Sequence, residues 1–326
     1  MIDELDYSFQ AMGSEVRLLI GRPLHGAAAT PLDAADRERA FVLDFARRLS
    51  RFASDSELSV LNHDPRPRVR ASPLLRAAVT AGIWAAERSG GLVDPTLVTA
   101  LERGGYGQSR AGARPASLPD ALTCAPPRQP AKPNRDARWR SIEVDDKNGT
   151  ISRPAGLMFD TGGTGKGLCA DAVAIRLAAY GRFVVDCGGD IAVGGIGAQL
   201  EPYEIVVEHP LNGEAVGTLS VAQGGVATSG LNVRIWRNDD GSFGHHLLDP
   251  GTGAPAWTGL VGATAVGDSA LEAETLSKLA LLLGPEGARE VLAPKGGVAF
   301  RDDGTVEPIG PVREQIALST TPLAVR

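Results

Sequence analysis

The alternation of apolar and polar residues divides the chain into strand-like and helix-like segments. The opening run FQAMGSEVRLLIG (9–21) alternates and predicts a strand. Helical spacing follows over 31–52 and again over 73–89, where Gly90 and Gly91 supply the usual helix stop. The same spacing predicts helices over about 166–179 and over 272–284. The chain therefore begins with a strand and a long helix, and it contains several further helices.

Short β-like runs occupy most of the second half of the chain. They are SIEVDD (141–146), GLMFDT (156–161), RFVVDCGG (182–189), YEIVVEHP (203–210), GTLSVA (217–222), GVATSG (225–230) and the tail GVAFRDDGTVEPI (297–309). Because turns rather than helices separate most of these runs, we expect an α+β fold with mixed, largely antiparallel sheets flanked by helices. No repeat or clean linker is visible, so residues 1–326 form one domain, and the segment 108–137, rich in Pro, Ala, Arg and Ser, is predicted to be a surface loop.

Composition and charge narrow the class of protein. The 326 residues are 43% hydrophobic and 22% charged, and the formal net charge is −6 with no basic run. These features argue against nucleic acid and favour a small molecule or a protein as partner. The acidic N-terminus lacks the pattern of a secretory signal, and no apolar stretch is long enough to span a membrane. Three cysteines without metal-type spacing indicate buried thiols, and we expect a soluble, cytoplasmic protein.

The most conspicuous local motif is the glycine cluster from Asp160 to Gly167, which lies between a predicted strand and a predicted helix. Glycines let a backbone approach a ligand, and a helix N-terminus favours negative charge, so a phosphate or pyrophosphate fits there. The string matches neither GxGxxG nor GxxxxGK[ST]. Taken alone, it is equally consistent with a structural turn.

Three further motifs place polar groups at the ends of apolar strands, where ligands often collect. They are Gly188-Gly189-Asp190, Thr228-Ser229-Gly230 and the run from His246 to Gly253. Each of them is also consistent with a turn. Without context, His246 would be interpreted as a structural histidine.

Taken in order, seven motifs resemble the ApbE family across about residues 8–284. They are AMGS (11–14), SDSELSVLN (54–62), GGLVDPTL (90–97), FDTGGTGKG (159–167) with Asp171, DCGGD (186–190), VATSG (226–230) and HLLDPGTG (246–253). The resemblance implies the fold of that family, of T-fold type. It also implies binding of FAD and the use of Mg²⁺ to transfer FMN to a threonine or serine of an acceptor protein, with release of AMP.

The resemblance also assigns residues to the flavin nucleotide. The Met12-Gly13 turn and Phe52 are expected to line the flavin ring, although Phe52 is equally consistent with a core position. His246 is expected to act as the base for the acceptor hydroxyl. The other residues expected around FAD are Asp55, Ser56, Glu57, Asp94, Thr96, Gly163, Thr164, Lys166, Asp190, Thr228 and Ser229.

The chain departs from the family at the metal site. The resemblance implies an aspartate and, four residues later, a threonine as Mg²⁺ ligands, but alignment on Leu283-Gly284 puts Glu274 and Lys278 there. Our hypothesis is that the Lys278 ammonium lies where the metal would lie. The carbonyl of Gly165, a further metal contact in the family, needs no particular side chain, so metal binding through Gly165 and Glu274 stays open.

Two alternatives to the transferase follow from this departure. One is an FAD-binding or carrier protein that does not transfer FMN, and the other is an FAD pyrophosphatase in which water replaces the acceptor hydroxyl. The sequence does not name the acceptor protein.

Overall fold

The fold is organised around an eight-stranded sheet. The computed structural model describes residues 4–24 and 29–315. The strands lie in the order β1-β2-β6-β7-β10-β13-β14-β15, and every neighbouring pair is antiparallel. Their bounds are Leu5–Ala11, Ser14–Ile20, Phe183–Cys187, Asp190–Gly194, Gly224–Gly230, Leu260–Gly267, Gly297–Arg301 and Val306–Ile309. The prediction of an α+β fold with antiparallel sheets is confirmed.

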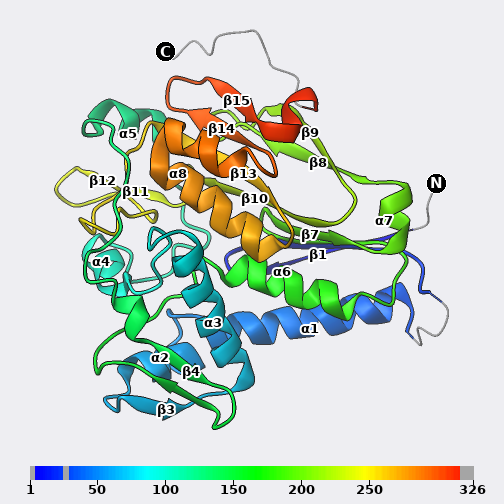
Figure 1. Ribbon diagram of the computed structural model, residues 1–326, viewed down its shortest axis with the longest axis horizontal. Coiled ribbons are helices and arrows are strands. Elements are labelled where there is room, and N and C mark those ends of the chain that lie inside the picture. Colours follow the sequence, from blue (N-terminus) through cyan, green and yellow to red (C-terminus); the bar gives the residue numbers. More distant parts are fainter. Residues whose placement is uncertain (1–3, 25–28, 316–326) are drawn as a thin grey trace.

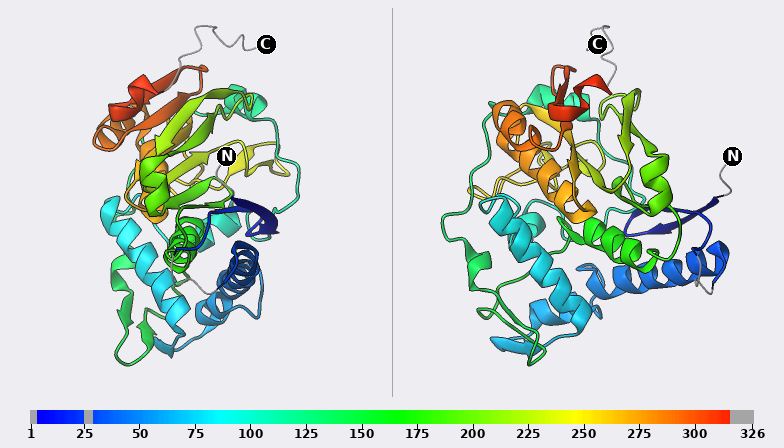
Figure 2. Two further views of the ribbon diagram at one scale, coloured as in Figure 1. Left: turned by 90° about the vertical axis from the view of Figure 1, so that its right-hand side faces the viewer. Right: turned by 45° about the vertical axis from the view of Figure 1, so that its right-hand side comes forward.

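Two helices cover one face of this sheet (Figure 1). Helix α6 (Gly165–Arg176) packs on β6 and β7, and α8 (Ala270–Leu292) packs on β10 and β13 and also contacts α6. Helices α1 (Pro31–Leu49) and α3 (Pro73–Arg88) lie at the end of the molecule opposite β14 and β15 (Figure 2). The four long helices were therefore predicted in the right places, and α8 extends past its predicted end through a kink at Gly284.

Shorter elements surround this core. The helical ones are α2 (Glu57–His63), α4 (Val98–Arg103), α5 (Leu118–Cys124), α7 (Ile196–Leu200) and the 3₁₀ turns η1 (Arg138–Ser141) and η2 (Gly310–Glu314). The remaining strands form three small antiparallel sheets. The first contains β3 (Arg68–Arg70), β4 (Glu143–Asp145) and β5 (Thr150–Ser152). The second contains β8 (Tyr203–Glu208) and β9 (Ala215–Val221), and the third contains β11 (Ile235–Arg237) and β12 (Phe243–His245).

Two large apolar clusters hold these elements together. One contains Leu260, Leu281 and Phe300 and lies between α8 and the C-terminal half of the sheet. The other joins β2 and β6 to α1, α3 and α6, with Val16, Phe159 and Val173 fully buried. Among the residues described, no helix is long and apolar enough to cross a membrane.

The structure corrects three sequence-based predictions. Residues 9–21 form not one strand but the β1–β2 hairpin, because Met12 and Gly13 both have positive φ and make a tight two-residue turn. The run 156–161 is not a strand, since the Asn62 side chain satisfies the backbone N–H and C=O of Phe159 in place of a neighbouring strand.

The third correction concerns the segment predicted to be a surface loop, 108–137. It contains α5, in which Leu118 and Ala121 are buried. The Ser117 side chain caps this helix and Pro119 lies in its first turn, where proline is tolerated. The rest of the segment is irregular and mostly exposed, so only the residues of α5 depart from the prediction.

Candidate functional site

Two adjoining cavities form one cleft beside the N-terminus of α6. The smaller has a volume of about 120 Å³ and the larger about 410 Å³. We call the two together the cleft. Residues that line both cavities are Arg51, Phe52, Tyr106, Asp160, Gly162 and Arg234.

Backbone geometry brings the glycine cluster to this cleft. Thr161 begins the turn by accepting, through its carbonyl, hydrogen bonds from the N–H groups of Thr164 and Gly165. Gly163 and Thr164 line the smaller cavity, while Gly165 and Lys166 line the larger one. The N–H groups of Gly165 and Gly167 are bonded to the Thr161 carbonyl and the Glu274 carboxylate, so the preference of this end of α6 for an anion rests on the helix dipole.

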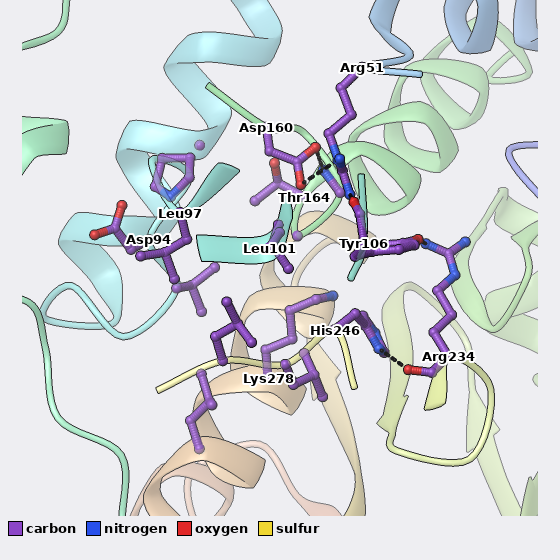
Figure 3. Close-up of a pocket in the computed structure, with 18 of the residues that line it drawn as sticks. Arg51, Asp94, Leu97, Leu101, Tyr106, Asp160, Thr164, Arg234, His246 and Lys278 are labelled. Carbon is purple, nitrogen blue, oxygen red and sulfur yellow. Dashed lines mark hydrogen bonds and ion pairs between the residues drawn. The ribbon is translucent and has the colours of Figure 1, made fainter. Parts of the chain in front are cut away.

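Aromatic and guanidinium groups form the wall shared by the two cavities. The Arg51 guanidinium lies 4.1 Å from the Phe52 ring centroid and 4.6 Å from that of Tyr106, and it donates to the Tyr106 carbonyl over 2.7 Å. Arg234 donates to the Tyr106 hydroxyl over 3.0 Å. Phe52 is 37% exposed, which favours the cleft position over the core position that the sequence left open. Figure 3 shows Arg51, Tyr106 and Arg234 on one side of the smaller cavity.

His246 is held as a neutral imidazole in the smaller cavity. Its Nδ1 lies 3.3 Å from the Arg234 carbonyl oxygen, which only accepts, so the proton is on Nδ1. Among the residues that the structure describes, Nε2 has no hydrogen-bond partner. Burial, together with the positive charges of Arg234 and Lys278, lowers the pKa of His246 well below its usual value. The imidazole is therefore neutral near pH 7, with Nε2 available to accept a proton.

Four charged side chains, buried or partly buried, form two ion pairs beside the cleft. Lys166 lies on α6 and Asp190 on β7, while Glu274 and Lys278 both lie on α8. Lys278 Nζ lies 2.9 Å from Glu274 Oε1, and Lys166 Nζ lies 2.7 Å from Asp190 Oδ2. Glu274 and Asp190 are 0% and 1% exposed. Burial raises the pKa of Glu274, and the nearby Asp190 raises it further, while the two lysines oppose these effects. Burial acts to lower the pKa of Lys166, but the two carboxylates outweigh it and raise that pKa.

Asp94 places a buried carboxylate oxygen at the smaller cavity. Its Oδ1 accepts from the Thr96 N–H over 2.8 Å and from the Thr96 hydroxyl over 2.6 Å, but its buried Oδ2 has no partner among the residues described. Burial raises the pKa of Asp94. An unpaired buried acceptor is costly, and a ligand donor would satisfy it. Thr96 therefore positions Asp94 rather than lining the cavity.

Several predicted site residues lie away from the cleft wall. Ser56 caps α2 by accepting from the Ser59 N–H, and Glu57 pairs with Arg48 and accepts from the Ser72 hydroxyl. Asp55, just before this cap, is exposed and lines neither cavity.

The polar pair on β10 is also bonded within the protein. Thr228 Oγ1 lies 2.8 Å from Thr264 Oγ1, and Ser229 Oγ lies 2.8 Å from Ser277 Oγ. Neither residue lines a cavity. The predicted cleft residues that do line one are Met12, Gly13, Phe52, Asp94, Gly163, Thr164, Gly165, Lys166, His246 and Lys278.

Sequence reasoning missed four residues of the cleft: Arg51, Tyr106, Asp160 and Arg234. The sequence places Asp160 at the start of the glycine cluster without predicting a contact for it. In the structure its carboxylate lies 3.6 Å from Arg51 Nε. The sequence signal for Arg51 is that it directly precedes Phe52, and the signal for Arg234 is that it lies near His246 along the chain. Their contacts with Tyr106 depend on chain segments far apart in sequence.

The donor set does not fit the Mg²⁺ ion that the family resemblance implies. Both Glu274 oxygens are occupied, one by Lys278 and the other by the Gly167 N–H over 2.8 Å. Mg²⁺ requires near-octahedral oxygen coordination. Across the described part of the chain, no three His, Cys, Asp or Glu side chains gather as a metal site.

Comparison with known proteins finds related sequences and folds. The chain is 28% identical over 257 residues to the FAD:protein FMN transferase of Klebsiella pneumoniae (strain 342), covering 77% of this chain and 71% of that protein. The fold is similar to that of the Thermotoga maritima ApbE protein, with a TM-score of 0.75 at 23% identity and coverage of 94% and 97% of the two chains. It is equally similar to the apo Pseudomonas stutzeri flavinyl transferase ApbE, with a TM-score of 0.75, 22% identity and 98% coverage of both chains.

These similarities agree with the order of the seven motifs along the sequence. The model of the ApbE family matches residues 12–301, which include both cavities and every motif apart from Ala11 of the first. This chain therefore belongs to the ApbE family.

Proposed function

We propose that this protein transfers FMN from FAD to a threonine or serine of an acceptor protein and releases AMP. The observation that carries the proposal is the neutral His246, whose Nε2 has no hydrogen-bond partner among the described residues. The names of the curated relatives support the reaction class.

The cleft offers a matching partner for each part of FAD. Phe52 presents exposed aromatic surface beside the larger cavity, which suits a flavin ring. The N-terminus of α6 and the side chains of Arg51 and Arg234 suit the pyrophosphate. The unpaired Asp94 Oδ2 suits a hydroxyl or amino donor of the adenosine half.

The chemistry is a single displacement at phosphorus. The acceptor hydroxyl oxygen bonds to the FMN phosphorus while the P–O bond to the AMP phosphate breaks. His246 Nε2 takes the hydroxyl proton, and AMP leaves with the bridging oxygen and its electron pair. Because the pKa of His246 is low, the base form persists below the pH at which an ordinary histidine is protonated.

The test is to incubate the purified protein with FAD and a threonine-bearing acceptor domain, following AMP by chromatography and the acceptor by mass spectrometry. We expect acceptor mass to rise in step with AMP. The His246→Gln variant should lose transfer by at least about a hundredfold while keeping FAD affinity. His63→Gln, a histidine of α2 outside both cavities, is the matched control and should behave as the parent.

The alternative activities give different results in the same assay. AMP without acceptor labelling indicates a pyrophosphatase, and tight FAD binding without AMP indicates a carrier. Retained transfer by His246→Gln would remove the assignment of His246 as the base.

A further inference from the structure

Lys278 is a buried cation directed into the candidate active site. It lies on α8, its side chain is 10% exposed, and it lines the smaller cavity together with His246 and Thr164. Figure 3 shows the Lys278 and His246 side chains pointing into the same space. An ammonium has three donors, and Glu274 is its one acceptor among the described residues. Donors therefore remain for a ligand in the cavity.

The surrounding contacts fix this cation in place. Glu274 is fully buried, and its second oxygen is held by the Gly167 N–H at the start of α6. An unpaired lysine in such a place would be strongly destabilising, so the Glu274 carboxylate offsets the cost of burying the ammonium. The Lys166–Asp190 pair beside it is anchored in the same way, with Lys166 also donating to the Gly188 carbonyl.

The same contacts exclude a divalent ion from this position. A metal bound by Glu274 would have to displace the Lys278 ammonium while lying beside its positive charge. The repulsion between a double and a single charge at a few ångströms is substantial in a partly buried site.

We propose that Lys278 replaces the divalent metal in this protein, so that FMN transfer proceeds without one. The inference rests on the proposed function. Lys278 donates a hydrogen bond to a pyrophosphate oxygen and offsets the negative charge that grows on the AMP phosphate as its bond to the FMN phosphorus breaks. It keeps its proton throughout, and His246 receives the proton of the acceptor hydroxyl.

The first experiment compares the parent protein in EDTA and in Mg²⁺. We expect AMP release and acceptor labelling to differ by less than about twofold, because the required charge is part of the chain. Mn²⁺, used as a paramagnetic probe without a nucleotide that would chelate it, should show no stoichiometric binding by electron paramagnetic resonance. Activity abolished by EDTA and restored by Mg²⁺, or one tightly bound Mn²⁺ per chain, would overturn the proposal.

The second experiment removes the charge without leaving a buried partner unpaired. In the double variant Lys278→Gln with Glu274→Gln, the amide oxygen at 274 still accepts from the Gly167 N–H and the amide N–H at 274 can donate to the amide oxygen at 278, so the protein should melt near the parent temperature. We expect its affinity for ADP, measured by calorimetry, to fall at least about tenfold, with or without Mg²⁺. Lys278→Arg should recover part of that affinity. The control is Lys295→Met, since Lys295 pairs with Asp268 and Glu272 outside the cleft.

The two proposals fail in different ways. If the parent neither releases AMP nor labels an acceptor under any condition, the transferase proposal fails, while the ADP measurement still tests Lys278. If the double variant binds ADP as tightly as the parent does, Lys278 does not contact the pyrophosphate and the inference is wrong.

Discussion

Replacing Asp171 by alanine should destabilise the protein through the start of α8. Asp171 lies on α6, and its two carboxylate oxygens accept from the N–H groups of Ala270 and Leu271 over 2.8 and 3.0 Å. These N–H groups belong to the first turn of α8, where no intrahelical acceptor is available. Asp171 therefore joins the helix that forms one wall of the cleft to the helix that carries Glu274 and Lys278.

The size of the effect follows from these two bonds. A hydrogen bond to a charged group contributes about 1.5–3 kcal/mol net, and loss of a helix cap costs about 1 kcal/mol. Burial raises the pKa of Asp171 despite the two backbone donors, so desolvation offsets part of the gain. We therefore expect Asp171→Ala to lower the free energy of unfolding by about 2–3 kcal/mol and Asp171→Asn, which keeps one acceptor, by about half as much.

Urea unfolding followed by circular dichroism measures this change. The control is Asp240→Ala. Among the residues described, the Asp240 side chain bonds to Ser242 alone, in an exposed turn, so the urea midpoint of this variant should stay close to that of the parent. A loss below about 1 kcal/mol for Asp171→Ala, or one equal to that of the control, would refute the capping role.

Two further predictions concern stability. Burial lowers the pKa of His245 to about 3, so as the pH falls the unfolded chain takes up a proton before the folded protein does. The contribution of His245 to the free energy of unfolding is therefore full above about pH 6.5 and declines progressively toward pH 3. At pH 5 the free energy of unfolding should be lower by about 2 kcal/mol. Comparing urea midpoints of the parent and His245→Gln across pH 5–8 checks this, and equal slopes would contradict it. A Cβ on Gly225 would lie 2.4 Å from the backbone N of Ala270, so Gly225→Ala should cost about 3 kcal/mol or more in thermal melts, whereas Gly107→Ala, whose site is open, should be nearly neutral.

The sequence by itself determined the elements whose formation depends on near neighbours. Apolar spacing located α1, α3, α6 and α8, because a helical face is set by residues three and four positions apart. The order of the motifs identified the family and predicted His246 and the glycine cluster as cleft residues, although their roles stay predictions. The sequence also places Glu274 and Lys278 where the family resemblance implies metal ligands, and the role of Lys278 in place of a metal stays a prediction.

Tertiary structure decided which polar residues face the cleft and which hold the fold. Ser56, Glu57 and Asp171 have the same chemistry as ligand-binding residues, yet they cap helices or bind Arg48. Arg51 and Arg234 became cleft residues through contacts with Tyr106, which lies far from both in sequence. Periodicity reports burial along one element, whereas the partner of a polar group depends on how distant elements pack, and that packing is fixed only when the whole core forms.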